Sequence, residues 1–242
     1  MDALTMELTP TSQKDTEETW ISISDMMAGL MVIFLFIAIS YMLYVRSEKD
    51  KIEQIALTYN QLQSALIDSL NNEFKYDFEK WNAELVDTTL SIQFRANQLN
   101  VLFGQGEAKL RPYFQDILNE FFPRYLEVLK LFKGEITEIR IEGHTSSEWI
   151  TGVGPDEAYI LNMELSQGRT RSVLEFVLQM PSIEQQDRNW IKRVLTANGL
   201  SSSQLLFVEG SEGREDRVKS RRVEFRVQTN AEKRIDIIVN QE

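Results

Sequence analysis

The sequence predicts an α/β protein with a single N-terminal transmembrane helix, a helical linker and a C-terminal α/β sandwich domain. Three observations lead to this prediction: an uncharged apolar run near the N-terminus, a charged stretch with a narrow apolar stripe, and short strand and helix patterns that alternate over residues 85–230. Strands that alternate with helices are typical of layered α/β domains, and a domain of this length can bury its own core.

The apolar run, residues 26–45, contains no charged side chain. A helix rises about 1.5 Å per residue, so this run matches a bilayer core of roughly 30 Å. Trp20 at one end and Tyr41 and Tyr44 at the other resemble an interfacial aromatic belt. The acidic flank, the length and the lack of a small-residue cleavage site argue against a signal peptide. We therefore expect an uncleaved transmembrane helix over residues 20–45, preceded by a tail, residues 1–19.

The next stretch, residues 46–84, is expected to be a helical linker. Its apolar residues recur at alternating spacings of three and four, at Ile52, Ile55, Tyr59, Leu62 and Leu66. Such a narrow seam is typical of a coiled coil or of a helix lying on a partner. The spacing changes to four after Leu66, so any coiled coil is short. A single packed helix and a paired helix are both compatible with this pattern.

Periodicity also predicts the elements of the domain over residues 85–230. Alternating apolar side chains predict strands in TTLSIQF (88–94), ITEIRIEG (136–143), QLLFVEG (204–210) and RRVEFRV (221–227). Helical spacing predicts one helix that begins at Pro112, a second over residues 162–180, and a third over residues 183–197 that stops at Asn198-Gly199. Residues 231–242 are expected to form a C-terminal tail.

Composition excludes several classes of function. The chain has 26 basic and 37 acidic residues, a net charge of −11, no cysteine and one histidine. The acidic excess argues against nucleic acid as a partner, because phosphate binding needs a surplus of Lys and Arg. Without cysteine, disulfides, Cys-zinc sites and thiol nucleophiles are excluded, and one histidine excludes a multi-His metal cluster. We expect no enzyme activity, no cofactor and no metal site.

Asp25 is the first candidate for chemistry. It lies at the start of the apolar run, and no basic residue accompanies it within that helix. An ionisable carboxyl group near lipid is typical of a proton carrier. The alternative is that Ser24 or Asp25 is an N-cap that accepts hydrogen bonds from the free N–H groups of the first helical turn. Position alone does not decide between these two interpretations.

A second group of polar residues surrounds the end of the strand over residues 136–143. His144 and Thr145 directly follow this strand, and the next helix carries Asn162, Leu165, Ser166 and Arg169 on one face, at i, i+3, i+4 and i+7. An amide and a guanidinium beside a strand-end loop suit a carboxylate ligand, which Arg169 could bind through two hydrogen bonds. Separately, His144 could be a structural hydrogen-bonding residue, and Arg169 a surface salt-bridge partner.

Three ordered motifs carry a family resemblance. I-E-G-H-T (141–145), N-x-x-L-S-x-x-R-T (162–170) and R-R-V-E (221–224) resemble the OmpA/MotB C-terminal peptidoglycan-binding family, and F-G-Q-G-E-A-K-L (103–110) is similar to its opening motif. The resemblance implies an OmpA-like domain that binds peptidoglycan through His144, Thr145, Ser146, Glu148, Leu161, Asn162, Leu165, Ser166 and Arg169. The chain departs from the family at Ser146, where an Asp is usual, and at Ser220, where an Asn is common. Glu148 is a candidate substitute for the missing carboxylate.

The N-terminal sequence W-I-S-I-S-D-M-M-A-G-L-M (20–31) resembles the MotB transmembrane signature. This resemblance implies that Asp25 is the proton carrier of a rotary stator, in which two copies of the chain associate with a ring-forming MotA-like subunit. Together, the two resemblances are closest to the MotB-like subunits of Zorya anti-phage systems, whose MotA-like partner is of the ZorA type. A flagellar-type stator subunit, or a passive OmpA-like cell-wall anchor without ion transport, is the alternative.

The sequence contains two conflicting indications of membrane orientation. Arg46, Lys49 and Lys51 follow the apolar run, whereas Lys14 is the one basic residue before it. The positive-inside rule then weakly places the C-terminal side in the cytoplasm. The family resemblance overrules this, because a peptidoglycan-binding domain must be periplasmic. We therefore expect a single-pass protein of the bacterial inner membrane with a cytoplasmic N-terminus.

Overall fold

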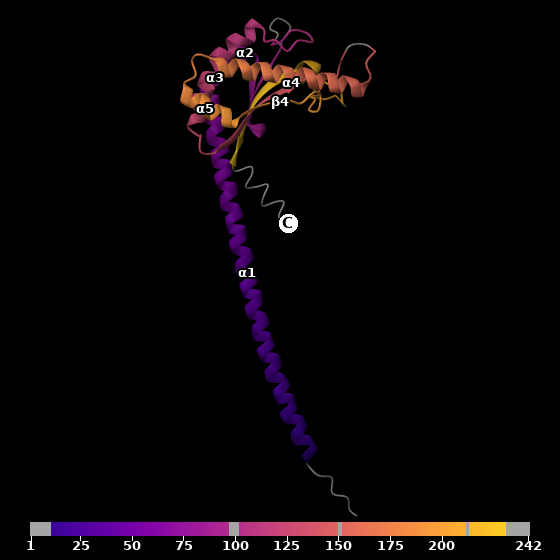
Figure 1. Cartoon of the computed structure of the whole chain (residues 1–242). Helices are drawn as coiled ribbons and strands as arrows, with labels where there is room; N and C mark the ends of the chain where they lie inside the picture. Colours follow the sequence, from indigo (N-terminus) through magenta and orange to yellow (C-terminus); the bar gives the residue numbers. More distant parts are fainter. Residues whose placement is uncertain (1–10, 97–101, 150–151, 212, 231–242) are drawn as a thin grey trace, which may run out of the picture. The chain divides into compact units, whose positions relative to one another are not determined.

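The computed structural model describes residues 11–96, 102–149, 152–211 and 213–230, with side chains from residue 20 onward. The chain divides into two units, Met1–Gln54 and Ile55–Glu242. Helix α1 (Thr11–Phe74) begins in the first unit and ends in the second (Figure 1). The expected terminal tails fall largely in residues 1–10 and 231–242, outside the described residues.

In the first unit, α1 includes the predicted membrane-spanning segment. The described residues contain one helix that is long and apolar enough to cross a membrane. Its large apolar side chains, such as Met31, Phe36 and Leu43, are more than half exposed, which is expected of a surface that faces lipid. The helix begins at Thr11 and continues through Ser24 and Asp25. The N-cap interpretation of these two residues is therefore wrong, because the polar residues before them extend the helix.

The second unit is built on one five-stranded sheet in the order β1-β2-β5-β3-β4. Strands β3 and β4 are parallel, and the other neighbours are antiparallel. A parallel pair needs a long crossover, and α4 and α5 supply it between β3 and β4. The strands are β1 (Ala83–Val86), β2 (Ser91–Arg95), β3 (Ile136–His144), β4 (Leu195–Gly199) and β5 (Arg222–Thr229). The helices after α1 are α2 (Phe78–Trp81), the 3-10 turn η1 (Asp87–Thr89), α3 (Pro112–Lys130), α4 (Pro155–Gln179), α5 (Gln185–Val194) and α6 (Arg217–Ser220).

The core lies between the helices and one face of this sheet. Because side chains alternate across a strand, Phe94 of β2, Ile141 of β3 and Phe225 of β5 all point to this face, and all are fully buried. Phe121 of α3 lies 4.9 Å from Phe94 and 5.1 Å from Phe225, measured between ring centroids. The opposite face carries the polar residues of the same strands. The predicted α/β sandwich is thus confirmed as a helical layer packed on a sheet.

The C-terminal end of α1 belongs to this core. Leu66, Leu70 and Phe74 are fully buried, and the Phe74 ring lies 5.2 Å from that of Phe121. Ile52, at the other end of the predicted seam, is exposed. The last residue of the seam therefore packs on this chain's own domain, as the packed-helix interpretation expects.

Several predicted elements are confirmed and two are wrong. The strands over 88–94, 136–143 and 221–227 correspond to β2, β3 and β5, and the predicted helices correspond to α3 and α4. The helix expected over 183–197 ends at Val194, because residues 195–199 pair with β3 as the edge strand β4. No strand forms over the described QLLFVEG segment, where a single bridge joins Phe207 to Glu215. Periodicity also missed the short edge strand β1.

Close packing explains why the last residue of β4 is a glycine. A Cβ atom on Gly199 would lie 2.3 Å from the backbone nitrogen of Gln167 and 2.7 Å from the carbonyl carbon of Ser166. The end of β4 therefore lies directly against α4, at the turn of the helix that carries Ser166. The Ser166 hydroxyl accepts a hydrogen bond from the backbone N–H of Ser201, at 3.1 Å.

Candidate functional site

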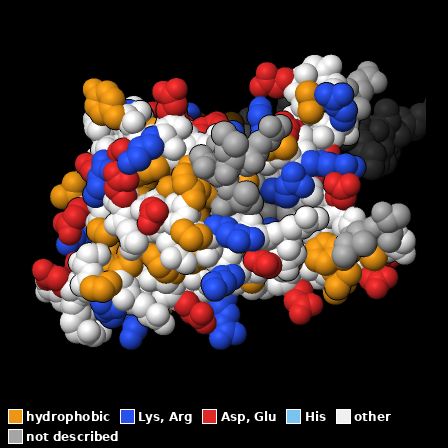
Figure 2. Space-filling view, turned by 90° about the horizontal axis from the view of Figure 1, so that it is seen from above, with side chains coloured by type: hydrophobic (Ala, Val, Ile, Leu, Met, Phe, Trp, Pro, Cys, Tyr) orange, Lys and Arg blue, Asp and Glu red, His pale blue; other side chains and the backbone are white. Residues whose placement is uncertain are grey.

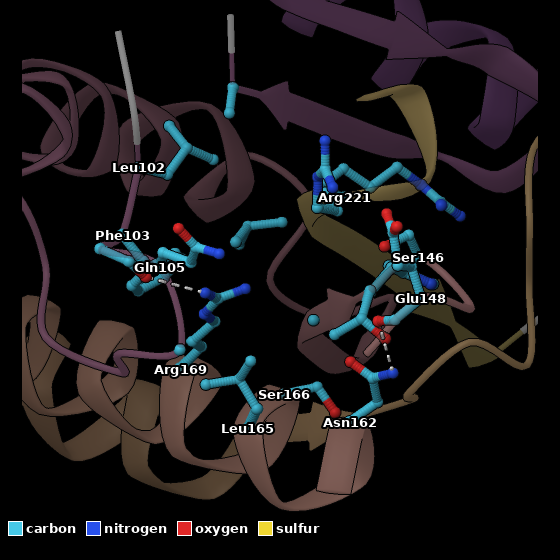
Figure 3. Close-up of a pocket in the computed structure, with 18 of the residues that line it drawn as sticks. Leu102, Phe103, Gln105, Ser146, Glu148, Asn162, Leu165, Ser166, Arg169 and Arg221 are labelled. Atoms are coloured by element: carbon cyan, nitrogen blue, oxygen red, sulfur yellow. Dashed lines mark hydrogen bonds between the residues drawn. The ribbon is translucent and has the colours of Figure 1, made fainter. Parts of the chain in front are cut away.

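A cavity of about 860 Å³ opens where β3 ends and α4 passes beside it (Figure 3). This volume is typical of small-molecule and peptide-group sites. The walls come from four parts of the second unit: the segment before α3, the loop after β3, one face of α4, and the start of β5. The described lining residues are Ala96, Leu102, Phe103, Gly104, Gln105, Gly106, Gly143, His144, Thr145, Ser146, Glu148, Trp149, Asn162, Leu165, Ser166, Arg169, Val218, Arg221, Arg222 and Val223.

The structure brings eight of the nine candidate ligand-binding residues together in this cavity. Asn162, Leu165, Ser166 and Arg169 line it from one face of α4, as their spacing predicts. The ninth, Leu161, does not line the cavity, because a helix turns about 100° between Leu161 and Asn162. Asp25 lies in the other unit, on α1.

Arg169 is held in place by backbone carbonyl groups and by an aromatic ring. Its Nε donates to the carbonyl oxygen of Glu107 at 3.0 Å, and its Nη2 donates to that of Gly104 at 3.1 Å. The guanidinium carbon lies 5.0 Å from the ring centroid of Phe103. Within the described part of the chain, Nη1 makes no hydrogen bond. Arg169 forms no salt bridge with a described residue, as the surface salt-bridge alternative would require, and no described residue hydrogen-bonds the Nη1 side of the guanidinium.

Hydrogen bonds anchor the start of the loop after β3. One of its buried polar groups has no partner among the described residues. The Thr145 N–H donates to the carbonyl oxygen of Ser201 at 2.9 Å, and Ser147 donates to the Glu215 carboxylate through its N–H and its hydroxyl group. The Thr145 hydroxyl is buried and has no hydrogen-bond partner among the described residues. An unpaired buried hydroxyl group costs free energy, so a ligand that pairs with it is favoured.

Asn162 and Glu148 are linked across the cavity. The Asn162 amide donates to the backbone carbonyl oxygen of Glu148 at 3.4 Å. The Glu148 carboxylate pairs with Arg217 at 3.2 Å. Glu148, the candidate substitute for the family's usual Asp, is therefore already bound to a cation, and it offers less charge to a ligand amine.

Arg221 and Arg222 line the cavity but were not among the candidate site residues. Arg222 is buried and donates to the Glu224 carboxylate and to two backbone carbonyl oxygens. Arg221 is exposed. Burial of Arg169, assisted by the positive charge of Arg221, lowers the pKa of Arg169 to about 10. Arg169 still carries its charge at neutral pH. The R-R-V-E motif contains both residues, but it gives no indication that the first Arg faces the helix that carries Arg169.

The charge of the lining defines the chemistry that suits this cavity. Three arginines, Arg169, Arg221 and Arg222, face it, against one acidic residue, Glu148. On the face drawn in Figure 2, basic and acidic side chains are interspersed with hydrophobic ones. The cavity therefore suits an anionic group, and a carboxylate matches the planar guanidinium geometry.

The His144 side chain lies beside the cavity but is fully buried. It lies on the polar face of the sheet, where Nε2 is 3.3 Å from Glu224 Oε1. Burial, assisted by Arg222, lowers the pKa of His144 to about 4, so the ring is neutral at neutral pH. The structure does not show a hydrogen-bonding role for His144, because neither ring nitrogen makes a hydrogen bond with the described residues.

Comparison with known proteins identifies the family. The chain is 44% identical, over 241 residues and the full length of both proteins, to Zorya protein ZorB of Escherichia coli strain ATCC 8739. The chain belongs to the ZorB family. A second Zorya protein ZorB, from E. coli O139:H28 strain E24377A, is 26% identical to it over 86% of this chain and 79% of that protein. No protein-family model matches the sequence.

Several solved structures are similar to this ZorB-family chain. A MotB-like protein from Desulfovibrio vulgaris is 24% identical, with a TM-score of 0.46 over 69% of this chain and 91% of that one. The type VI secretion cell-wall anchor of Pseudomonas aeruginosa is 21% identical, with a TM-score of 0.43 over 66% and 96%. The periplasmic domain of Helicobacter pylori MotB is 17% identical, with a TM-score of 0.39 over 66% and 89%.

Proposed function

We propose that this ZorB-family chain is the MotB-like subunit of a proton-driven rotary motor in the bacterial inner membrane, where it anchors the motor to peptidoglycan during anti-phage defence. One observation carries the proposal: the match to Zorya protein ZorB covers the full chain, so it includes both the apolar helix with Asp25 and the domain with the cavity. Neither role requires a covalent intermediate or a bound cofactor.

The cavity would bind a carboxylate of the peptidoglycan stem peptide. Arg169 would supply its free Nη1 side, with Arg221, the residue before β5, adding positive charge. The unpaired Thr145 hydroxyl and Ser146 would contact the ligand from the loop after β3. Leu165 would pack against apolar parts of the stem. This arrangement selects an anionic group, because Arg169 and Arg221 supply positive charge to the cavity, whereas Glu148 is paired with Arg217.

Replacing Arg169 tests the anchoring role. Arg169→Ala removes the guanidinium that faces the cavity, and we expect the loss of about 1.5–3 kcal/mol of charged hydrogen bonding, or roughly a tenfold or greater loss of affinity. Co-sedimentation of the purified full-length chain in detergent with isolated peptidoglycan measures this. Arg171→Ala is the matched control, since Arg171 lies on the same helix, is exposed and pairs only with Glu175 among the described residues. Equal binding by both variants and the wild type would place the peptidoglycan site elsewhere.

In the membrane, Asp25 would carry the proton. It is the single charged residue in residues 20–45, and protonation would change the charge of the helix where it faces a partner subunit. A change of charge in one chain biases the conformations of a partner only if the partner contacts that group. Two copies of this chain inside a ring of MotA-like subunits of the ZorA type would provide that contact. The N-terminus would lie in the cytoplasm and the second unit in the periplasm.

Replacing Asp25 tests the motor role. Asp25→Asn keeps the size and hydrogen bonding of the side chain but cannot take up a proton, so we expect proton flux and phage protection to be lost while membrane insertion is unchanged. Flux is measured in proteoliposomes that contain the chain and its MotA-like partner, and protection by phage plating. Asp50→Asn, on the same helix outside the apolar run, is the control.

The outcomes of this experiment separate the alternatives. If Asp25→Asn protects cells as well as the wild type, the chain is a passive anchor without ion transport. A deletion strain that loses swimming instead of phage protection would indicate a flagellar-type stator subunit.

A further inference from the structure

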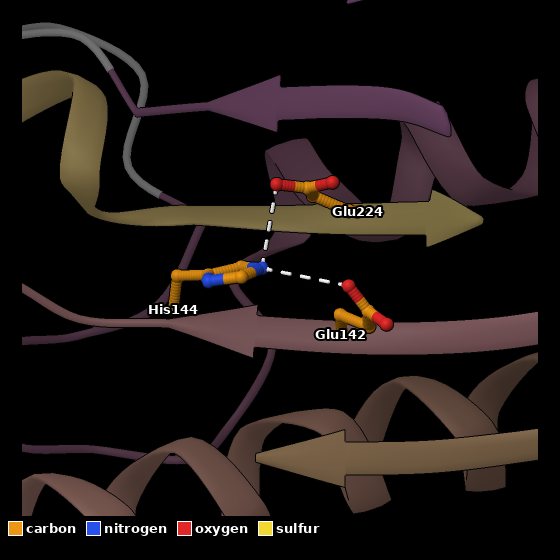
Figure 4. A group of neighbouring side chains, drawn as sticks. All are labelled: Glu142, His144 and Glu224. Carbon is orange, nitrogen blue, oxygen red and sulfur yellow. Dashed lines mark ion pairs between the residues drawn. The ribbon is translucent and has the colours of Figure 1, made fainter. Parts of the chain in front are cut away.

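The polar face of the sheet contains a buried group of three side chains that the proposed function does not use. Glu142 and His144 of β3 and Glu224 of β5 point toward one another (Figure 4). Their residues are 3–4% exposed. One oxygen or nitrogen atom from each side chain lies within 4.8 Å of the others. His144 Nε2 lies 3.3 Å from Glu224 Oε1 and 3.9 Å from Glu142 Oε2.

Strand register explains why these residues meet. In the antiparallel pair of β3 and β5, Glu142 lies directly opposite Glu224, and His144 lies opposite Arg222. Glu142 and His144 are two residues apart on β3, so their side chains are on the same face. Directly opposed carboxylates repel each other. A group that binds between them is therefore favoured.

Two of these side chains, Glu142 and His144, have few close polar partners for such buried groups. The His144 side chain is 0% exposed, and neither of its ring nitrogens has a hydrogen-bond partner among the described residues. Among the described residues, the Glu142 carboxylate forms ion pairs at 3.9 Å with Arg140 and with His144. Buried polar groups are costly without partners, and buried charges are normally paired or bound to a metal.

We propose that Glu142, His144 and Glu224 bind a divalent transition-metal ion, for which Zn²⁺ is the best match. One imidazole nitrogen and two carboxylate oxygens are ligands that Zn²⁺ accepts, and three protein ligands leave a fourth position for water. Metal-bound carboxylates are usually oriented by further hydrogen bonds. Glu224 Oε1 accepts such bonds from Arg222 Nε at 2.6 Å and from Gln93 Nε2 at 3.1 Å.

The ion would tie β3 to β5 at the edge of the cavity. His144 is the last residue of β3, and the next residues, Thr145 and Ser146, line the cavity. Fixing His144 would therefore hold the loop that carries them. The site was not expected from the sequence, because the ligands come from two strands that are far apart in the chain and include only one histidine.

Neighbouring arginines oppose the binding of a cation and provide a test. Arg140 lies 3.9 Å from Glu142, Arg222 contacts Glu224, and Arg226 lies close enough to lower the pKa of Glu142 against the effect of burial. Glu138 neutralises part of this charge by pairing with Arg140 at 2.9 Å. Removing the charge of Arg140, which is not a ligand, must strengthen metal binding by Coulomb's law.

The experiment measures Zn²⁺ binding to the full-length chain, purified in detergent with a tag that contains no histidine and treated with a chelator. Isothermal titration calorimetry should give one ion per chain. Glu142→Gln and His144→Gln should each weaken binding at least tenfold, whereas Glu120→Gln, at an exposed carboxylate paired with Lys80, should not. Absence of binding to the wild type, or equal binding by the ligand variants, would overturn the proposal.

Two further measurements keep the test valid if a ligand variant fails to fold. Arg140→Gln retains all three ligands, and we expect it to bind Zn²⁺ several-fold more tightly than the wild type. Co²⁺ bound in place of Zn²⁺ should give visible absorption bands of a four-coordinate site with nitrogen and oxygen ligands. Unchanged affinity in Arg140→Gln, or a six-coordinate Co²⁺ spectrum identical to that of the ion in buffer, contradicts the proposed site.

Discussion

Arg169 shows how neighbouring residues prepare a single side chain for binding. An arginine loses several rotamers when it is fixed, and this entropy is a cost of binding unless it is met in advance. Here the carbonyl groups of Gly104 and Glu107 and the ring of Phe103 already fix the guanidinium. The ligand then meets an ordered cation instead of a flexible one.

Phe103 should therefore contribute to peptidoglycan affinity through its contact with the Arg169 guanidinium. Phe103→Leu keeps an apolar side chain in the core but removes the ring beneath Arg169, a cation–π contact worth about 0.5–1 kcal/mol at a partly exposed site. We expect peptidoglycan affinity to fall roughly two- to fivefold. Co-sedimentation measures this, and Phe103→Tyr, which retains the ring, should bind like the wild type.

At the scale of elements, Arg124 of α3 makes several polar contacts with the end of α1 and with the residues that follow it. Arg124 of α3 donates from Nε to Glu73 Oε1 at 2.6 Å, from Nη2 to the Glu73 carbonyl oxygen at 2.7 Å, and from Nη1 to Asp77 Oδ2 at 2.9 Å. Its guanidinium also lies 4.9 Å from the Phe74 ring centroid. A planar fork of donors makes all these contacts at once, whereas an ammonium group cannot.

Arg124→Lys retains the positive charge but not this geometry. Because the side chain is about one-third exposed, solvent screens part of the interaction, and we expect the free energy of unfolding to fall by about 1 kcal/mol. Denaturant unfolding of the chain in detergent, followed by the fluorescence of its buried tryptophans, measures the change. Arg193→Lys, on the exposed surface of α5, should leave the midpoint unchanged.

At the scale of the whole second unit, a group of aromatic rings joins elements that are distant in the chain. Phe121 lies within 6.0 Å of the rings of Phe74, Trp81, Phe94, Tyr125 and Phe225, which come from α1, α2, β2, α3 and β5. One side chain thus contacts the end of the N-terminal helix, the second strand of the sheet and its central strand.

Truncating Phe121 should therefore destabilise the whole domain. Phe121→Ala leaves a cavity among fully buried rings, and we expect a loss of about 3–5 kcal/mol in the free energy of unfolding. Chemical denaturation followed by circular dichroism gives this value. Phe207→Ala is the control, because Phe207 is about half exposed, and it should change stability by less than about 0.5 kcal/mol. A similar loss in both variants would contradict a core centred on Phe121.

Local sequence patterns were sufficient to predict the parts of the molecule whose surroundings are uniform. The segment over residues 20–45 is long enough and apolar enough to cross a bilayer, so length and apolarity alone identify it. Strands β2, β3 and β5 have one buried and one polar face, so their alternation is visible in the sequence. The four α4 residues Asn162, Leu165, Ser166 and Arg169 share a face because the helical repeat is fixed. These features are properties of short segments.

Contacts between distant segments could be identified only from the tertiary structure. Residues 195–197 were predicted as the end of a helix but form part of β4, because the edge of β3 offers hydrogen bonds that outweigh local propensity. The sequence placed Arg169 in a site, but only the fold shows that Gly104, Glu107 and Phe103 hold it. The meeting of Glu142, His144 and Glu224 depends on the register of β3 and β5. Register is set by the packing of the whole sheet, which no short segment encodes.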